Sequence, residues 1–180
     1  MIYLIGGVPR VGKSTLSQRI LNNKHIPWIS LDMVRQMLFD AAPQLNLKEG
    51  ENWWETTPSK FYPFLRELVK NADDTKIDHV FEGDTFFPEH AAKLKKDFLL
   101  KACFLGTSQI TVSILKENPG IQNWLEKLPE DKLNNMPTWL MEKSKMFESE
   151  CKKYKLPYFD VGKNHQETLQ KAYDSLFIIE

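Results

Sequence analysis

The sequence predicts an α/β fold in which helices cover both faces of a parallel β-sheet, giving three layers. Two observations lead to this expectation. Short apolar segments alternate with segments of helical period along nearly the whole chain, and a strand, helix, strand sequence needs a crossover that leaves the two strands parallel. The length of 180 residues, with 42% hydrophobic residues, suits one domain with a substantial core. We therefore expect a single domain over residues 1–180.

The first elements are a strand, a glycine turn and a helix. Residues 2–5 are apolar and run directly into the turn, after which Leu16 and Ile20 lie one helical turn apart. Residues 26–31 form the second expected strand. The next expected helix covers 32–42, with Asp32 at its entrance as a candidate N-cap.

Pro43 is expected to stop this second helix. The following stretch has no clear period and contains the adjacent pair Trp53-Trp54. We expect residues 41–58 to form an irregular, partly helical excursion beside the site, followed by a helix from about residue 59 to residue 71.

The second half continues the alternation of strands and helices. Residues 108–154 are expected to be mostly helical, with breaks at Pro119, Pro129 and Pro137. A segment of this length between two strands suits a mobile lid. The other expected elements are strands at 77–84, 100–107 and 156–162, and helices at 86–98 and 165–177.

Composition narrows the class of protein. Lys and Arg together number 24, as do Asp and Glu, so the total charge does not favour nucleic acid as a partner. Cys103 and Cys151 are far apart and belong to no zinc motif, which fits two core or half-buried thiols in a reducing compartment. The apolar run at residues 1–5 is too short for a signal peptide or a membrane span. We expect a cytoplasmic protein without a membrane partner.

One motif carries a specific chemistry. The segment GVPRVGKS, Gly7 to Ser14, matches G-x-x-x-x-G-K-[ST] and lies between the first strand and the first helix, as this motif requires. Glycines at both ends let backbone N–H groups converge on phosphates, Lys13 reaches the β and γ oxygens, and Ser14 offers a hydroxyl to Mg²⁺. The residues expected at the nucleotide are Gly7, Arg10, Val11, Gly12, Lys13, Ser14 and Thr15.

Two classes of nucleotide-binding protein are disfavoured. A GTPase switch needs N-K-x-D and a D-x-x-G after the third strand, and neither is present. An oligomeric motor needs a late arginine that completes the neighbouring site. The four arginines all precede residue 67; they are Arg10, Arg19, Arg35 and Arg66.

The remaining pattern resembles the small P-loop kinases, the superfamily of adenylate kinase, 2-phosphoglycerate kinase and chloramphenicol phosphotransferase. Besides the phosphate loop, three segments carry the resemblance: ISLDMVRQML, VFEGDTFFPEH and PYFDVGKNHQETLQKAYDSL. The resemblance covers nearly the whole chain. It implies a five-stranded parallel sheet of order 2-3-1-4-5, ATP as phosphoryl donor and Mg²⁺ as cofactor. It also puts Asp32 and Arg35 on the acceptor side and Glu82 near the metal through water.

Phosphoryl transfer requires an acceptor oxygen held in line with the γ-phosphorus, and a base for its proton. Asp32 is the candidate base, the alternative being a helix cap alone. Arg35 is expected to bind the acceptor, or else to be an exposed cation. Asp84 either contacts the acceptor, as a rival base, or caps its loop. Glu82 at a buried strand end fits a metal site or a structural ion pair.

An aromatic wall for the acceptor is expected from Trp53 or Trp54, although adjacent residues rarely face one pocket, so at least one of them is expected to pack in the core. Trp28, Trp124 and Trp139 are interpreted as packing residues.

The sequence departs from the nucleotide kinases in its cations. No arginine follows EGD, and the candidate lid offers only Lys116, Lys127, Lys132, Lys143, Lys145, Lys152 and Lys153. Support for the transferring phosphoryl group then falls to Lys116, to Arg10, or is weak.

These departures favour a small hydroxyl-bearing acceptor and an ATP- and Mg²⁺-dependent phosphotransferase. A nucleoside or nucleotide kinase is the nearest alternative. A nucleotide-binding regulatory protein with little turnover is an alternative of another class. Either a monomer or a homodimer is compatible with the sequence.

Overall fold

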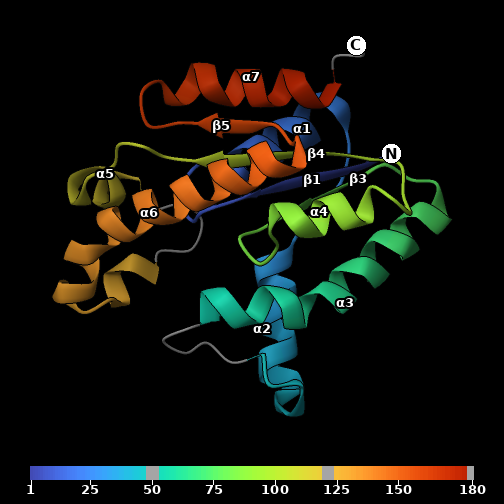
Figure 1. Cartoon of the computed structure of the whole chain (residues 1–180), viewed down its shortest axis with the longest axis horizontal. Helices are drawn as coiled ribbons and strands as arrows, with labels where there is room; N and C mark the ends of the chain where they lie inside the picture. The colour runs from blue at the N-terminus through green and yellow to red at the C-terminus, as the bar shows by residue number, and fades with distance from the viewer. Residues whose placement is uncertain (48–52, 119–123, 178–180) are drawn as a thin grey trace.

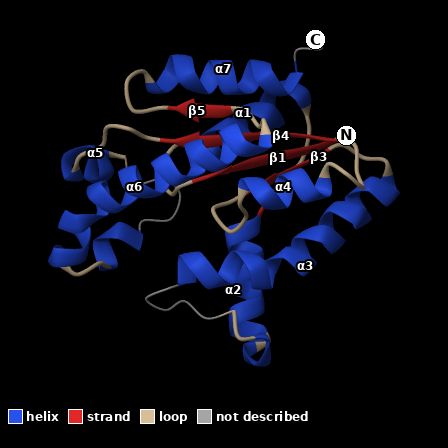
Figure 2. Cartoon of the chain, viewed as in Figure 1, coloured by secondary structure: helices blue, strands red, loops and turns tan. Residues whose placement is uncertain are grey.

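A computed structural model of the chain describes residues 1–47, 53–118 and 124–177. Five strands form one sheet in the order β2-β3-β1-β4-β5, and every neighbouring pair is parallel (Figure 1, Figure 2). The fold class and strand order predicted from the sequence are therefore confirmed. The strands are β1 (Ile2–Gly7), β2 (Trp28–Ser30), β3 (His79–Glu82), β4 (Leu100–Gly106) and β5 (Tyr158–Asp160).

Helices cover both faces of this sheet. On one face α1 packs on the central strands and on α7, while α3, α4 and α6 cover the other face (Figure 1). The helices are α1 (Lys13–Lys24), α2 (Leu31–Ala41), α3 (Trp53–Thr75), α4 (Pro88–Leu94), α5 (Val112–Glu117), α6 (Glu130–Tyr154) and α7 (His165–Phe177), with short 3₁₀ turns η1 (Pro43–Leu45) and η2 (Trp124–Lys127).

The core is densest around β1 and β4. All six residues of β1 are buried, because the strand is central and covered on both faces. On the face covered by α4 and α6, the rings of Phe86, Phe104 and Phe147 pack together, with centroid distances of 5.5 and 5.8 Å to the middle ring, Phe104. This cluster holds α6 against the sheet.

Helix α3 begins six residues before the expected start and is longer than expected. It runs from Trp53 to Thr75 and includes Pro58 and Pro63, so the last residues of the expected partly helical excursion, 53–58, are the first residues of this helix. The reason is an apolar stripe at helical spacing. Its buried members pack under the sheet and outweigh the hydrogen bonds that the prolines remove; they are Trp54, Phe61, Leu65, Val69 and Ala72.

Helix α2 begins one residue earlier than expected. Ser30 stands at its N-cap position and Asp32 is the second helical residue, so the expectation that Asp32 is the N-cap is wrong. Leu31 is fully buried. Its packing in the core favours a helix that begins directly after β2, at Leu31. The Asp32 carboxylate is left to make contacts outside its own helix.

Helix α6 contains Pro137 without ending there, whereas Pro129 occupies its N-cap position. Pro119 lies outside the described residues. The second half of α6 is part of the core, with Leu140, Phe147 and Cys151 buried. A mobile lid, which stays a prediction, would be limited to the residues that precede this half.

Both thiols lie in the interior, as expected. Burial raises the pKa of Cys103 and of Cys151 to about 12, so neither is a thiolate at neutral pH. Within the described residues, no helix has the length and apolar character that crossing a membrane requires.

A buried histidine makes the stability of the fold depend on pH. His90 in α4 is 2% exposed, accepts a hydrogen bond from the Phe87 N–H at Nδ1 (3.2 Å) and stacks on Tyr62. Its Nε2 lies 3.3 Å from Glu89 Oε1. Burial lowers the pKa of His90 to about 4; Glu89 opposes this shift and Lys93 adds to it.

Because the folded pKa lies below the ordinary value, the unfolded chain takes up the proton first as the pH falls. The contribution of His90 is therefore intact above about pH 7 and is lost between about pH 6.5 and 4, by up to about 3 kcal/mol. We expect the difference in free energy of unfolding between wild type and His90→Gln to shrink over this range. Urea unfolding at several pH values measures it. His79→Gln, at a partly exposed strand position, is the control, and a pH-independent difference for His90→Gln would contradict the prediction.

Candidate active site

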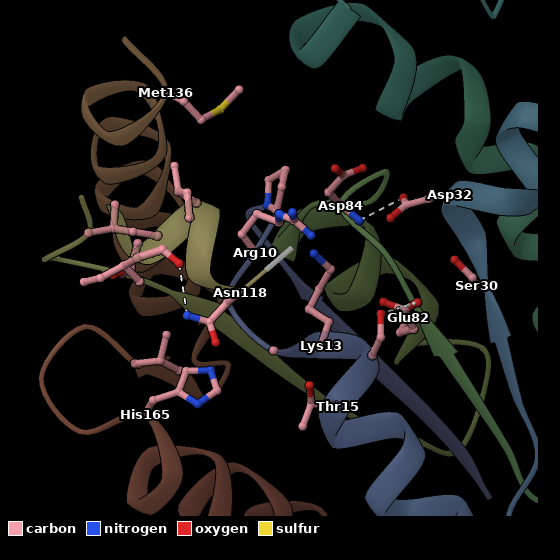
Figure 3. A pocket seen from close by; sticks show the side chains of 18 of the residues that line it. Arg10, Lys13, Thr15, Ser30, Asp32, Glu82, Asp84, Asn118, Met136 and His165 are labelled. Carbon is pink, nitrogen blue, oxygen red and sulfur yellow. Dashed lines mark hydrogen bonds between the residues drawn. The ribbon is translucent and has the colours of Figure 1, made fainter. Parts of the chain in front are cut away.

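One large cleft opens at the carboxyl end of the sheet, where all five parallel strands end. The loops after β1, β3 and β5 line it, together with the start of α2 and one side of α6 (Figure 3). The α6 residues in its wall recur at helical spacing; they are Lys132, Asn135, Met136, Trp139 and Lys143. The cleft thus joins segments that are far apart in the sequence.

The loop between β1 and α1 has the backbone of a phosphate-binding loop. Gly7 has a φ of 128°, and a Cβ there would lie 1.9 Å from the Leu105 carbonyl oxygen of β4. Gly12 has a φ of 92°, and its missing Cβ would lie 3.0 Å from His165 Nε2. Both positions therefore require glycine, and the two glycines set the path of the loop from the end of β1 to the start of α1.

Lys13 lies at the first position of α1 and is 6% exposed. Its Nζ donates a 2.8 Å hydrogen bond to the Val8 carbonyl oxygen, so the side chain crosses the loop rather than pointing to solvent. Val11 is fully buried, which leaves only its backbone for a ligand, while Thr15 is exposed in the cleft. Five residues expected at the nucleotide thus line one cleft: Arg10, Gly12, Lys13, Ser14 and Thr15.

Ser14 and Glu82 meet across the cleft floor. The Ser14 hydroxyl donates to Glu82 Oε1 at 3.3 Å, although 68 residues separate them in the chain. Glu82 Oε2 is buried without a hydrogen bond of normal geometry, although the Ser30 hydroxyl lies near enough to affect the pKa. Two oxygen ligands beside a phosphate loop suit Mg²⁺, which needs few protein ligands when phosphates supply the rest.

Burial raises the pKa of Glu82, and the Asp32 carboxylate adds to this, whereas Lys13 and the hydroxyls of Ser30 and Ser14 lower it. Among the described residues no cluster of three or more acidic, His or Cys side chains could hold a metal by itself. The donor set therefore fits a cation that arrives with phosphates. Ser30, which pairs with Glu82 across β2 and β3, was not singled out from the sequence.

Asp32 is held by the loop that follows β3. Its Oδ1 accepts hydrogen bonds from the Asp84 N–H (3.1 Å) and from the Thr85 hydroxyl (2.8 Å). A Cβ at Gly83 would lie 2.9 Å from this same oxygen, so glycine lets the loop come close. Thr85 is fully buried and was also not singled out from the sequence; its place directly after EGD was the available signal.

Asp84 and Arg35, the two charged residues expected to contact an acceptor, both line the cleft, where their charges interact. Both are nearly buried, with exposed fractions of 8% and 7%. Burial raises the pKa of Asp84 well above its usual value and Asp32 adds to this, whereas Lys13 and Arg35 oppose it. Arg35 is therefore not an exposed surface cation.

Trp53 and Trp54 are the two adjacent tryptophans from which an aromatic wall for the acceptor was expected. The Trp53 side chain lies outside the described part of the chain, so its expected contact with an acceptor stays a prediction. Trp54 is 3% exposed and packs edge-on against Trp139 (5.0 Å between centroids) and Phe147 (5.8 Å). Trp54 and Trp139 also line the cleft, so they are packing residues that form its apolar wall.

Two further residues of the cleft wall come from the end of α5 and the start of α7. Asn118, whose amide donates to the Ile114 carbonyl oxygen at 3.0 Å, and His165 both face the cleft (Figure 3). Neither residue type has a motif that would have marked it. Of the candidate lysines, Lys132 and Lys143 line the cleft, while Lys116 is not among the described residues of its wall.

The hydrogen bond from Thr85 to Asp32 can be tested without knowledge of the reaction. Thr85→Val keeps the shape of the side chain but removes one hydrogen-bond donor from Asp32 Oδ1. We expect this change to lower the free energy of unfolding by about 1.5–3 kcal/mol. Thr85→Ser keeps the hydroxyl and loses one methyl group, worth about 0.8 kcal/mol. Urea unfolding of both variants measures the difference. An equal or larger loss in Thr85→Ser would contradict the hydrogen bond.

Comparisons with known proteins bear on the fold. No protein-family model matches the chain, and no curated protein matches it in sequence. A shikimate kinase from Bacteroides thetaiotaomicron superimposes with a TM-score of 0.61 at 16% identity, covering 99% of both chains. A shikimate kinase from Acinetobacter baumannii in complex with shikimate gives 0.59 at 15% identity (96% and 90% covered), and a gluconokinase from Sinorhizobium meliloti gives 0.57 at 15% identity (97% and 90% covered). The chain therefore has the fold of these small kinases.

Proposed function

We propose that the chain is an ATP- and Mg²⁺-dependent phosphotransferase that moves the γ-phosphoryl group to a hydroxyl of a small molecule. The observation that carries the proposal is the meeting of two half-sites in one cleft. Lys13, Ser14 and Glu82 form a donor side, and Asp32 and Arg35 lie beside it on the acceptor side. The similar structures named gluconokinase and shikimate kinase support a small hydroxylated acceptor.

In the proposed reaction the acceptor oxygen forms a bond to the γ-phosphorus. The bond from that phosphorus to the bridging oxygen breaks, and its electron pair leaves with ADP. The hydroxyl proton goes to Asp32, whose Oδ1 is held by Thr85 and Asp84. Lys13 neutralises charge on the phosphates. Mg²⁺, when bound, would neutralise phosphate charge and orient the phosphates, held by Ser14 and, through water, by Glu82.

The acceptor class is tested by ADP formation from MgATP with a panel of hydroxyl compounds. Shikimate and gluconate are tested first, because the similar structures include a shikimate kinase and a gluconokinase. Nucleosides and nucleoside monophosphates follow. Stimulation by one small non-nucleotide alcohol supports the proposal. Stimulation by a nucleoside or nucleotide alone would favour that kinase class instead. If no acceptor stimulates ADP formation while ATP binds, a nucleotide-binding regulatory protein is favoured.

Asp32→Asn tests the base. The amide keeps the shape but cannot take the proton, so we expect kcat to fall about 100- to 10,000-fold with little change in ATP affinity. Steady-state kinetics with the stimulating acceptor and calorimetry with an ATP analogue measure the two quantities. Phosphorylation at the wild-type rate would show that another group is the base.

Glu82→Gln tests the metal role. Because the amide is a weaker partner for metal-bound water, we expect the Mg²⁺ concentration for half-maximal rate to rise about 10- to 100-fold. The fold is expected to survive, since burial already disfavours the charge on Glu82. The measurement is a Mg²⁺ titration of the rate, with thermal unfolding as the control. An unchanged Mg²⁺ dependence would assign Glu82 a structural role.

A further inference from the structure

Arg10 has an unusual backbone. It lies in the middle of the phosphate-binding loop with a φ of 68°, in the left-handed region that glycine adopts readily and other residues adopt at a cost. The two other residues of this loop with a positive φ, Gly7 and Gly12, are glycines. A large charged side chain therefore stands where the backbone favours glycine, which points to a use for the side chain.

The side chain of Arg10 turns into the cleft. Figure 3 shows it extending toward the same part of the cleft as Lys13 and Asp84. Burial lowers the pKa of Arg10, but a guanidinium remains charged at neutral pH. The Asp84 carboxylate also lies here, and its charge interacts with Lys13. Two positively charged side chains beside the start of α1 suit a polyanionic ligand such as a triphosphate.

The three other described arginines have contacts that differ from those of Arg10. Arg19 donates from Nη1 to Gln170 Oε1 at 3.1 Å, which ties α1 to α7. Arg66 is 3.4 Å from Asp97 and lies over the Phe98 ring, outside the cleft wall. Arg35 is buried beside Asp84 on the acceptor side. Arg10 is the described arginine that belongs to the phosphate loop itself.

The lysines of α6 are less suited to the same task. Lys132 and Lys143 line the cleft from the opposite wall, but an ammonium is a point charge on a flexible stem. A guanidinium is a planar fork that can bond two phosphoryl oxygens at once. A cation on the loop backbone is also already in place before any part of α5 or α6 moves. Position and chemistry therefore both favour Arg10.

We propose that Arg10 is a catalytic residue that hydrogen-bonds the oxygens of the transferring phosphoryl group and stabilises their charge in the transition state. The inference rests on the phosphotransferase function proposed above. While the bond to the acceptor oxygen forms and the bond to the bridging oxygen of ADP breaks, the charge that leaves with ADP and the charge on the transferring group are held by Arg10 and Lys13. The candidate lid contains no arginine. Arg10 would supply a guanidinium from within the phosphate loop instead.

The test uses MgADP with aluminium fluoride, which imitates the transferring phosphoryl group and requires no knowledge of the acceptor. Calorimetry compares the affinity for MgADP with and without aluminium fluoride in wild type, Arg10→Ala and Arg10→Lys. Wild type is expected to bind MgADP more tightly when fluoride is present. Arg10→Ala is expected to lose about 100- to 1,000-fold of this enhancement, with the affinity for MgADP alone changed only a few-fold. Arg10→Lys is expected to lie between the two.

Two controls separate chemistry from folding. Arg66→Ala removes an arginine outside the cleft and is expected to keep the full enhancement. Arg10→Gly removes the same side chain and relieves the left-handed backbone, so it is expected to unfold at a higher temperature than Arg10→Ala. It is also expected to show the same loss of enhancement. If Arg10→Gly is more stable than Arg10→Ala and loses the same enhancement by aluminium fluoride, the loss does not come from unfolding.

The outcomes distinguish this inference from the proposed function. If wild type shows the enhancement and Arg10→Ala retains it, the role of Arg10 is wrong while the kinase function stands. If wild type shows no enhancement and no acceptor stimulates ADP formation, the proposed kinase function is wrong, and the role of Arg10 that rests on it is wrong too. If Arg10→Ala loses affinity equally with and without fluoride, Arg10 only binds the nucleotide, and the catalytic role is overturned.

Discussion

The close approach of Gly7 to β4 is the contact on which the site depends. Because a Cβ at Gly7 would lie 1.9 Å from the Leu105 carbonyl oxygen, only glycine lets the chain leave β1 here and turn over the sheet edge. This turn directs the loop toward the start of α1 and puts Lys13 at its first position. The central place of β1 then lets elements from both sides reach the same point. The position of the proposed phosphate site at this edge thus follows from one steric condition.

The other half of the cleft is organised by hydrogen bonds to a carboxylate. Asp32 comes from α2, and the loop after β3 bonds it through the Asp84 N–H and the Thr85 hydroxyl. Glycine at position 83 lets that loop come close. Two neighbouring strand ends are thereby linked through one oxygen. In the proposed phosphoryl transfer, this oriented carboxylate would be placed to take the proton of the acceptor hydroxyl.

Sequence patterns were reliable where a local rule was sufficient. The motif from Gly7 to Ser14 has its expected place between β1 and α1, and the alternation of strands and helices predicts the fold class. They failed where packing outweighs a local preference. Pro58 does not delay the start of α3, because the buried face that includes Trp54 and Phe61 holds the helix together. Asp32 reads as a helix cap from its sequence position, yet the buried Leu31 starts the helix one residue earlier.

The sequence by itself determined the phosphate loop, the parallel α/β architecture and the residue types available for chemistry, since these depend on local spacing and on the steric needs of glycine. Only the tertiary structure decided which of those residues meet. Ser14 lies against Glu82, Thr85 against Asp32, and the guanidinium of Arg10 turns into the cleft, because the parallel strands bring their carboxyl ends to one edge. The physical reason is that side-chain direction depends on backbone conformation and burial, and neither is encoded in spacing along the chain.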